Sequence, residues 1–290
     1  MANLKSLRNR IRSVKNTQQI TKAMKMVSAA KLRRSQDRAQ SARPYGQHIR
    51  RMVGALASQM DPHSAPRLLA PAKGKRIELL VFTADRGLCG SFNSSVIRAV
   101  RAKVKSLQES GHVVTISCVG RKGFDVLKRQ YKSQIRRSFS GMTKNLTFDR
   151  VNSSLTTQVL SDFAKDEFDV CLVAYNTFKS ALTIEMTWKQ IIPMTVEPQE
   201  GTQGGSPIYE PEESEVLTEL LPHGVSVQIY QALVESDASE QGARMTAMDN
   251  AVRNAGDMIR KLSIKYNRTR QAAITTELME IIGGAESLKG

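Results

Sequence analysis

The glycine-rich segment Thr83–Asn93 is the part of the sequence best suited to bind a ligand. It reads Thr-Ala-Asp-Arg-Gly-Leu-Cys-Gly-Ser-Phe-Asn and lies between an apolar run and an amphipathic stretch, where a strand passes into a helix. Helix N-terminal amides at such turns attract phosphate groups. The glycine spacing fits neither G-x-G-x-x-G nor G-x-x-x-x-G-K-[ST]. We therefore predict a tight structural turn, with nucleotide binding as the alternative.

The other reactive residue types form no recognisable catalytic or metal-binding pattern. The four histidines are scattered without metal-ligand spacing, and no serine lies in a nucleophile elbow. The acid pairs Asp166-Glu167 and Glu212-Glu213 lie on polar stretches, where a solvated face is expected rather than acid–base chemistry. The sequence thus predicts no catalytic residue, no metal site and no cofactor, and a protein that is not itself an enzyme.

Cysteine usage and hydropathy limit the class of protein. Cys89, Cys118 and Cys171 are odd in number and contain no C-x-x-C motif, so we expect small buried side chains in a reducing cytoplasm. The chain is 40% hydrophobic and 24% charged, which is typical of a folded protein. It contains no run of 18 apolar residues and no signal-peptide pattern. We expect a chain that neither spans a membrane nor is secreted.

Positive charge is concentrated in residues 1–60. This segment has fourteen Lys or Arg and one acid, Asp37, so it carries +13 of the formal net charge of +16. Such a segment is expected to meet an acidic partner, which could be nucleic acid, an anionic membrane surface or acidic protein loops.

Both ends of the chain are predicted to be long helices, because all nine prolines lie between Pro44 and Pro222. Apolar residues recur at spacings of three and four at both ends, and ten positions in heptad register near the C-terminus predict a coiled coil. Both helices join the middle of the chain at their inner ends, so the pair should be antiparallel. The predicted seams are Leu4, Leu7, Ile11, Val14, Ile20, Met24 and Val27, and Met245, Met248, Val252, Ala255, Ile259, Leu262, Tyr266, Thr269, Ala273 and Thr276.

Local signals set the expected limits of these helices. Pro44 should kink or break the first helix, which could resume to about residue 58. The C-terminal rod is expected over residues 223–282 and should stop at Gly283-Gly284. Gln18 and Thr21 should weaken packing in the first seam but fix its register.

The middle of the chain predicts an α/β domain with a largely parallel, Rossmann-like sheet, because short apolar runs alternate with amphipathic stretches. The expected organisation is an N-terminal coiled-coil helix over 1–58, the α/β domain over 75–198, and a foot segment with the C-terminal coiled-coil helix over 206–290. Strands are expected at 77–83, 113–119, 135–139, 170–175 and 182–187, and helices at 91–108, 122–129 and 150–165.

Three motifs in this order resemble the γ subunit of F-type ATP synthases. They are Ile20–Arg33, the turn Asp85–Asn93, and Tyr266–Leu278 continued to Gly283-Gly284-Ala285-Glu286. The resemblance covers essentially the whole chain. The cysteine-bearing insertion of the plant chloroplast form is missing, so the resemblance is to a bacterial type.

The resemblance implies a rotor shaft rather than an enzyme. Paired terminal helices would turn inside a hexamer of α and β subunits, and the α/β domain would contact the ε subunit and the c ring. The chain would couple proton flow to ATP synthesis or hydrolysis at the cytoplasmic face of the inner membrane, associated peripherally through the complex.

By motif, Arg270 and Gln271 would contact loops of the catalytic subunits. Met24 would face an acidic loop of the β subunit, with simple seam packing as the alternative. Tyr209 and Glu210 would rest on the c ring, unless they form an ordinary turn.

Two other functions are considered for this composition. The basic N-terminal segment could bind nucleic acid, although the sequence contains no recognisable nucleic-acid module and has only 5% aromatic residues. A nucleotide-dependent enzyme built on the α/β domain is the third possibility.

Overall fold

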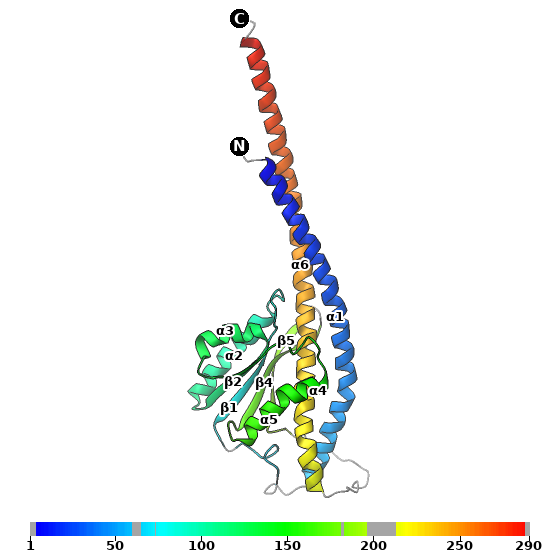
Figure 1. The fold of residues 1–290 in the computed structure, drawn as a ribbon, viewed down its shortest axis with the longest axis vertical. Helices are drawn as coiled ribbons and strands as arrows, with labels where there is room; N and C mark the ends of the chain where they lie inside the picture. The colour runs from blue at the N-terminus through cyan, green and yellow to red at the C-terminus, as the bar shows by residue number, and fades with distance from the viewer. Residues whose placement is uncertain (1–3, 60–64, 73, 181–182, 196–212, 288–290) are drawn as a thin grey trace. The chain divides into compact units, whose positions relative to one another are not determined.

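A computed structural model describes residues 4–59, 65–72, 74–180, 183–195 and 213–287 (Figure 1). The chain divides into two compact units. The first combines residues 1–27 with 245–290, and the second comprises residues 28–244. Two long helices, α1 (Leu4–Gln59) and α6 (Glu213–Ser287), contribute residues to both units.

The second unit contains a five-stranded sheet with the order β3-β2-β1-β4-β5. All neighbours pair in parallel except β4 and β5, which are antiparallel. This arrangement confirms the predicted α/β class and the largely parallel sheet. The strands are β1 (Arg76–Phe82), β2 (Val113–Val119), β3 (Ile135–Phe139), β4 (Val170–Phe178) and β5 (Ile184–Ile192).

Helices cover both faces of the sheet (Figure 1). On one face, α2 (Phe92–Glu109) and α3 (Arg121–Tyr131) bury an apolar cluster against β1 and β2. On the other face a larger cluster joins the sheet to α4 (Phe148–Val151), a π-helical turn, α5 (Thr157–Ala164), and parts of α1 and α6. The π-helical turn, Asn152–Thr156, divides the single helix that the sequence predicted over 150–165.

Within the second unit, α6 is a core helix. Almost every side chain from Leu221 to Arg244 is buried or half-buried. A helix that is covered on all sides cannot show a single apolar stripe, which explains why this stretch has no clear heptad pattern.

A kink or a break was expected at Pro44; a break is wrong, because α1 continues through Pro44 to Gln59. Pro44 removes the donor to the carbonyl of Gln40, and both residues lie on the exposed side of the helix, where water can hydrate that carbonyl. On the opposite side Ile49, Val53 and Leu56 are buried in the core. Packing of the segment after the proline thus maintains the helix.

The predicted stop at Gly283-Gly284 is also wrong, because α6 continues to Ser287. Neither glycine has a positive φ. A glycine inside a helix costs only about 1 kcal/mol relative to alanine, and it ends a helix only where the chain adopts the left-handed conformation.

Candidate functional site

The first unit is an antiparallel pair formed by the start of α1 and the end of α6. Arg8 Nη2 donates to the Tyr266 hydroxyl at 2.8 Å, and Gln18 Nε2 donates to the Val252 carbonyl at 3.2 Å. Residue numbers rise along α1 as their partners' numbers fall along α6, which confirms the predicted antiparallel pairing. We refer to this pair as the shaft.

An ion pair closes the shaft near its inner end. Lys25 Nζ lies 2.5 Å from Asp249 Oδ1, and Arg253 Nη2 lies 3.2 Å from Asp249 Oδ2. The hydrogen bond from Lys25 lowers the pKa of Asp249. These side chains are partly exposed, so they fix the register of the two helices more than they stabilise the fold.

The seam of α1 differs from the predicted one. The less exposed positions follow a regular spacing of three and four through Leu4, Leu7, Ile11, Val14, Gln18, Thr21 and Lys25. Gln18, which was expected to fix the register of the seam, forms a hydrogen bond to α6, whereas the Thr21 hydroxyl bonds to carbonyls of its own helix. Gln18 and Thr21 were expected in this seam, and continuing the heptad count from Leu4 would also have included Lys25.

Ile20 and Val27, which the sequence placed in the seam, are instead exposed. Their side chains are 61% and 56% exposed, and the nearby Met26 is 59% exposed. On α6 the predicted seam holds from Met245 to Ala273, whereas Thr276 is exposed. The helical pair therefore shows large apolar side chains on its outer surface.

The end of α6 extends past the described start of α1. Arg8 lies beside Tyr266, so the antiparallel register brings Leu4 level with about residue 270. Beyond this point α6 carries a set of large apolar side chains that are at least half exposed: Ile274, Leu278, Met279, Ile281 and Ile282. Exposed apolar surface of this kind marks a site of contact with another protein.

In the second unit, directional hydrogen bonds hold α6 in one orientation. Ser35 Oγ on α1 donates to Asp237 Oδ2 at 2.5 Å, and Ser239 Oγ donates to the Asn176 carbonyl of β4 at 2.8 Å. A buried ion pair, Arg244 with Glu240 at 2.7 Å, lies one turn further along. Buried polar contacts of this kind resist rotation of a helix about its axis, because turning α6 would leave polar groups unpaired.

The glycine-rich turn packs directly against this part of α6. Cys89 and Phe92 form a buried cluster with Ala243, and Arg244 Nη2 donates to the Gly87 carbonyl at 3.4 Å. Leu88, with φ 64°, is 64% exposed. The turn therefore links the sheet to α6.

Two polar side chains of the turn, Asp85 and Asn93, accept hydrogen bonds within the chain. Asp85 accepts hydrogen bonds from the backbone amides of Arg121 and Gly141 at 3.1 and 2.9 Å, and Asn93 Oδ1 accepts one from the Ala84 amide at 2.9 Å. The side chains of Asp85 and Asn93 thus bind backbone amides of the chain itself, which fixes the shape of the turn. These bonds, together with the packing of Cys89 and Phe92 against α6, agree with the structural interpretation of the turn.

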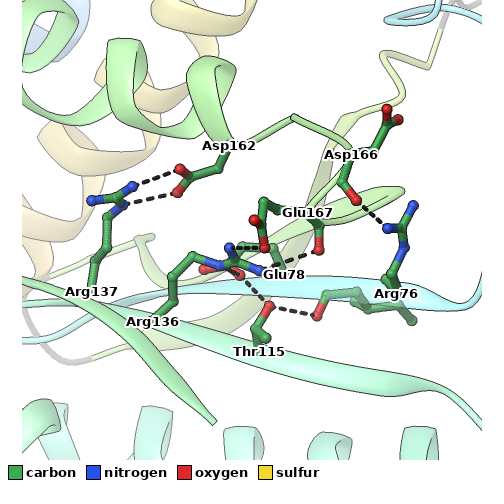
Figure 2. A network of polar contacts seen from close by, with 9 residues as sticks. Arg76, Glu78, Thr115, Arg136, Arg137, Asp162, Asp166 and Glu167 are labelled. Carbon is green, nitrogen blue, oxygen red and sulfur yellow. Dashed lines mark hydrogen bonds and ion pairs between the residues drawn. The ribbon is translucent and has the colours of Figure 1, made fainter. Parts of the chain in front are cut away.

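A charged network crosses the amino-terminal edge of the sheet (Figure 2). Arg136 on β3 lies 3.2 Å from buried Glu78 on β1 and 2.8 Å from Glu167. Arg137 donates hydrogen bonds to both carboxylate oxygens of Asp162, at 2.6 and 2.9 Å. Burial raises the pKa of Glu78, and hydrogen bonds and Arg136 oppose the shift.

This network binds the loop between α5 and β4 to the sheet and does not form a catalytic pair. Arg76 donates to both carboxylate oxygens of Asp169, at 2.8 and 3.1 Å, and to the Asp166 carbonyl. The carboxylates of this network are therefore paired with arginines. They do not form the carboxylate pairs that acid–base catalysis commonly uses.

The described residues contain no helix that is long and apolar enough to cross a membrane.

Comparison with known proteins identifies the family. A family model described as ATP synthase matches residues 3–288. The ATP synthase gamma chain of Magnetococcus marinus is 53% identical, with all of both chains covered, and that of Rhodospirillum rubrum is 48% identical, covering 99% of this chain and 100% of that one. The chain belongs to the gamma chain family of ATP synthases. This confirms the bacterial γ-type resemblance.

Solved structures of the same kind share the fold. A chain of the central stalk and c ring of the Tetrahymena thermophila mitochondrial ATP synthase superimposes with a TM-score of 0.60 at 28% identity, covering 80% of this chain and 99% of that one. A chain of the Euglena gracilis mitochondrial ATP synthase superimposes with a TM-score of 0.68 at 20% identity, covering 98% and 94%. The second likeness concerns the fold alone.

The residues that the γ-type resemblance singled out lie in different places. Met24 is half-buried beside the seam of the shaft, whereas Arg270 and Gln271 are exposed on α6 where its pairing with α1 ends. Tyr209 and Glu210 lie outside the described residues. Sequence patterns did not indicate the cross-helix pairs of Arg8 and Lys25, because each depends on which residue of a distant helix lies opposite.

Proposed function

We propose that this chain is the central shaft of a rotary ATP synthase and carries no catalytic site itself. The c ring, driven by proton flow, turns the chain. The chain in turn changes the conformations of the catalytic sites in a surrounding hexamer of α and β subunits. An asymmetric element can do this because its contacts differ among the three copies of each neighbour.

The exposed apolar surface of the shaft carries this proposal. Ile20, Met26 and Val27 on α1 and Ile264 and Ile281 on α6 are each more than half exposed. Exposing such side chains to water is unfavourable, by about 25 cal/mol for each Å². A close sleeve of neighbouring subunits would bury them.

Torque transmission follows from the continuity of the two helices. Both α1 and α6 are continuous helices that contribute residues to each of the two compact units. The hydrogen bonds of Ser35 and Ser239 hold α6 against its neighbours in the second unit, and the contacts of Gln18 and Lys25 lock the helices of the shaft.

Three residues are proposed to contact the catalytic subunits. Arg270 and Gln271 are exposed at the point where α6 continues alone, so a loop of a surrounding subunit could bind them from the side. Met24 lies next to exposed Met26 and Val27 and would meet an acidic loop of the β subunit. The basic surface of α1 would attract such loops, and salt should weaken that attraction.

The contacts with the c ring and the ε subunit are proposed from the family resemblance alone. Tyr209 and Glu210 would rest on the c ring, and the α/β domain would bind the ε subunit. The complex would then hold this chain at the cytoplasmic face of the inner membrane, without a membrane-spanning segment of its own.

Reconstitution tests the proposal. Purified α and β subunits should form an ATPase-active hexamer with this chain present, and the chain should elute with that hexamer. Equal activity without the chain, or failure of the chain to elute with the hexamer, would contradict the proposal.

A pair of substitutions tests the role of the exposed apolar surface of the shaft. Changing Ile20 and Val27 to serine should weaken binding to the hexamer by about tenfold or more, because both are lost from an apolar interface. The matched control is Val113→Ser on β2, which is also exposed, at 62%, but lies in the other unit. An equal effect of the control would show that the exposed apolar residues of the shaft have no special role.

A further inference from the structure

The second unit contains a groove that the shaft function does not use. It has a volume of about 1120 Å³ and is lined by one side of α1, by β5 and by α6. We call it the α1–β5 groove. Its volume lies slightly above the range of about 300–1,000 Å³ that is typical of small-molecule sites.

The charged side chains of the groove are mostly positive. Arg43, Arg50 and Arg51 line it from α1 and Lys189 lines it from β5, against a single acid, Glu235 on α6. Within the described part of the chain, Arg43, Arg51 and Lys189 form no ion pair, and Arg50 donates only to the amide oxygen of Gln231, at 3.2 Å. The groove therefore has positive charge that the described residues do not neutralise.

The charges from opposite walls act on one another. Burial lowers the pKa of Lys189, and the nearby Arg50 guanidinium lowers it further, whereas Glu235 raises it. Tyr175 also lines the groove, and burial with the adjacent Glu235 carboxylate raises its pKa to about 12. Glu235 thus lies beside the Tyr175 hydroxyl. The arginines of α1 and Lys189 of β5 line the same groove.

One wall of the groove is fixed by hydrogen bonds. Gln231 Nε2 donates to the Ala42 carbonyl at 3.1 Å while its amide oxygen accepts from Arg50. Gly46 permits this approach, because a Cβ there would lie 2.0 Å from Gln231 Nε2. Arg50 is therefore held in place by α6, which reduces the entropy lost when it binds a ligand.

The spacing of the arginines indicates the length of the ligand. Arg43 and Arg50 are two helical turns apart, about 10 Å along α1, so the positive charges are distributed along the groove. Guanidinium groups bind phosphate oxygens through paired hydrogen bonds, and lysine adds a point charge. A chain of phosphates could reach the arginines and Lys189 together.

We propose that the α1–β5 groove binds a polyphosphate chain, either free or as part of a nucleotide. The groove then gives the chain a ligand site outside the shaft. This proposal does not depend on the proposed rotor function, because it concerns the isolated full-length chain.

Calorimetric titration of the full-length chain with tripolyphosphate, ATP and orthophosphate tests the proposal, without magnesium. Tripolyphosphate should bind with one site per chain and more tightly than orthophosphate by about tenfold or more, since it can reach more cations. Equal affinities for tripolyphosphate and ATP would identify the phosphate chain as the recognised group. Tighter binding of ATP would support the nucleotide form.

Variants locate the site. Lys189→Met and Arg51→Gln should each weaken tripolyphosphate binding by about tenfold, and neither residue forms an ion pair in the described structure that its removal would break. The control, Arg101→Gln, removes an exposed charge from α2 outside the groove. It should leave the affinity within about twofold.

Several results would overturn the proposal. One is absence of saturable binding. Another is an equal loss of affinity in the Arg101→Gln control, which would indicate attraction to the net charge of +16 alone. A third is displacement of tripolyphosphate by an acidic hexaglutamate peptide at the same concentration as ATP, which would assign the groove to an acidic protein segment.

Discussion

At the residue scale, Glu78 places a carboxylate in the core of the α/β unit. Its side chain is 2% exposed and lies between Thr115, which donates to it, and Arg136. One carboxylate oxygen, Oε1, has no hydrogen-bond partner among the described residues. Burial disfavours the charged form of such a group, even with an arginine beside it.

The raised pKa of Glu78 predicts a pH dependence of stability. The folded chain holds this proton more tightly than the unfolded chain does, so the contribution of Glu78 to the free energy of unfolding falls as the pH rises from 4.5 through the raised pKa. Glu78→Gln should therefore become more stable relative to the parent chain between about pH 4.5 and about pH 7. Urea unfolding followed by the fluorescence of Trp188, the single tryptophan, measures this.

The control for Glu78 is Glu185→Gln, which removes an exposed carboxylate paired with Lys179. It should show no such change between the two pH values. An unchanged difference in unfolding free energy for Glu78→Gln would show that its carboxylate is ionised with equal ease in both states.

Gly120 gives a second prediction at this scale. Its φ is 106°, and a Cβ there would lie 1.9 Å from the Thr83 carbonyl oxygen, where β1 passes into the glycine-rich turn. Gly120→Ala should destabilise the α/β unit by ~3 kcal/mol or more, because both the backbone conformation and the space forbid a side chain. Urea unfolding measures the loss.

Gly111→Ala separates these two causes. Gly111 has a φ of 76°, but no atom lies within 4 Å of the position that a Cβ would occupy there, so this variant should cost only about 1 kcal/mol. Equal losses in the two variants would mean that backbone conformation alone, and not the approach of Thr83, requires glycine at position 120.

At the element scale, the end of α6 is predicted to act without supporting the fold. Residues beyond Gln271 extend past the described start of α1 and expose Ile274, Leu278 and Ile281. Removing residues 272–290 should shift the free energy of unfolding of the α/β unit by less than about 0.5 kcal/mol. Trp188 fluorescence reports that unit.

The same truncation should impair coupling in a membrane-reconstituted complex. ATP-driven proton uptake should fall relative to ATP hydrolysis, because the apolar end of α6 no longer meets the surrounding subunits. If Trp188 instead reported unfolding at lower urea, the end of α6 would be part of the structural core. Unchanged coupling would remove the proposed role of that end.

The helices and strands show what local sequence predicts. Strands such as Val113–Val119 were predicted at their observed bounds, because a buried strand is a short apolar run between turn signals. Pro44 and Gly283 misled the prediction of helix limits, because packing and solvation decide whether a helix continues. Ile20 and Val27 were assigned to the seam because they are apolar, although a strict heptad count from Leu4 places both outside it.

The contacts that make up the candidate site were less predictable. The bond from Ser35 to Asp237 joins residues far apart in the sequence, and neither type is unusual for an exposed helix face. The groove around Arg50 and Lys189 likewise depends on how α1, α6 and β5 meet. No periodicity within one segment contains that information.

At the scale of the whole molecule, the chain combines the α/β unit, in which hydrogen bonds hold α6 in one orientation, with the helical shaft. Residues 28–244 include the sheet and the buried part of α6, and residues 1–27 with 245–290 form the shaft. The two long helices are common to both units, so a rotation imposed on one should reach the other through hydrogen-bonded backbone. This account requires that the chain turns as one body during catalysis by its neighbours.

Labelling for such a measurement is straightforward, because Cys89, Cys118 and Cys171 are all buried. Burial raises the pKa of each thiol, to about 12 for Cys118, and a protonated, inaccessible thiol reacts slowly with maleimide. Ser110→Cys, at the exposed end of α2, should therefore take up a single probe.

The most direct test is single-molecule observation of that probe in a complex whose hexamer of α and β subunits is fixed to a surface. During ATP hydrolysis the probe should rotate in one direction, through full turns, at a rate proportional to ATP turnover. Hydrolysis at the normal rate with a stationary or randomly moving probe would contradict the account.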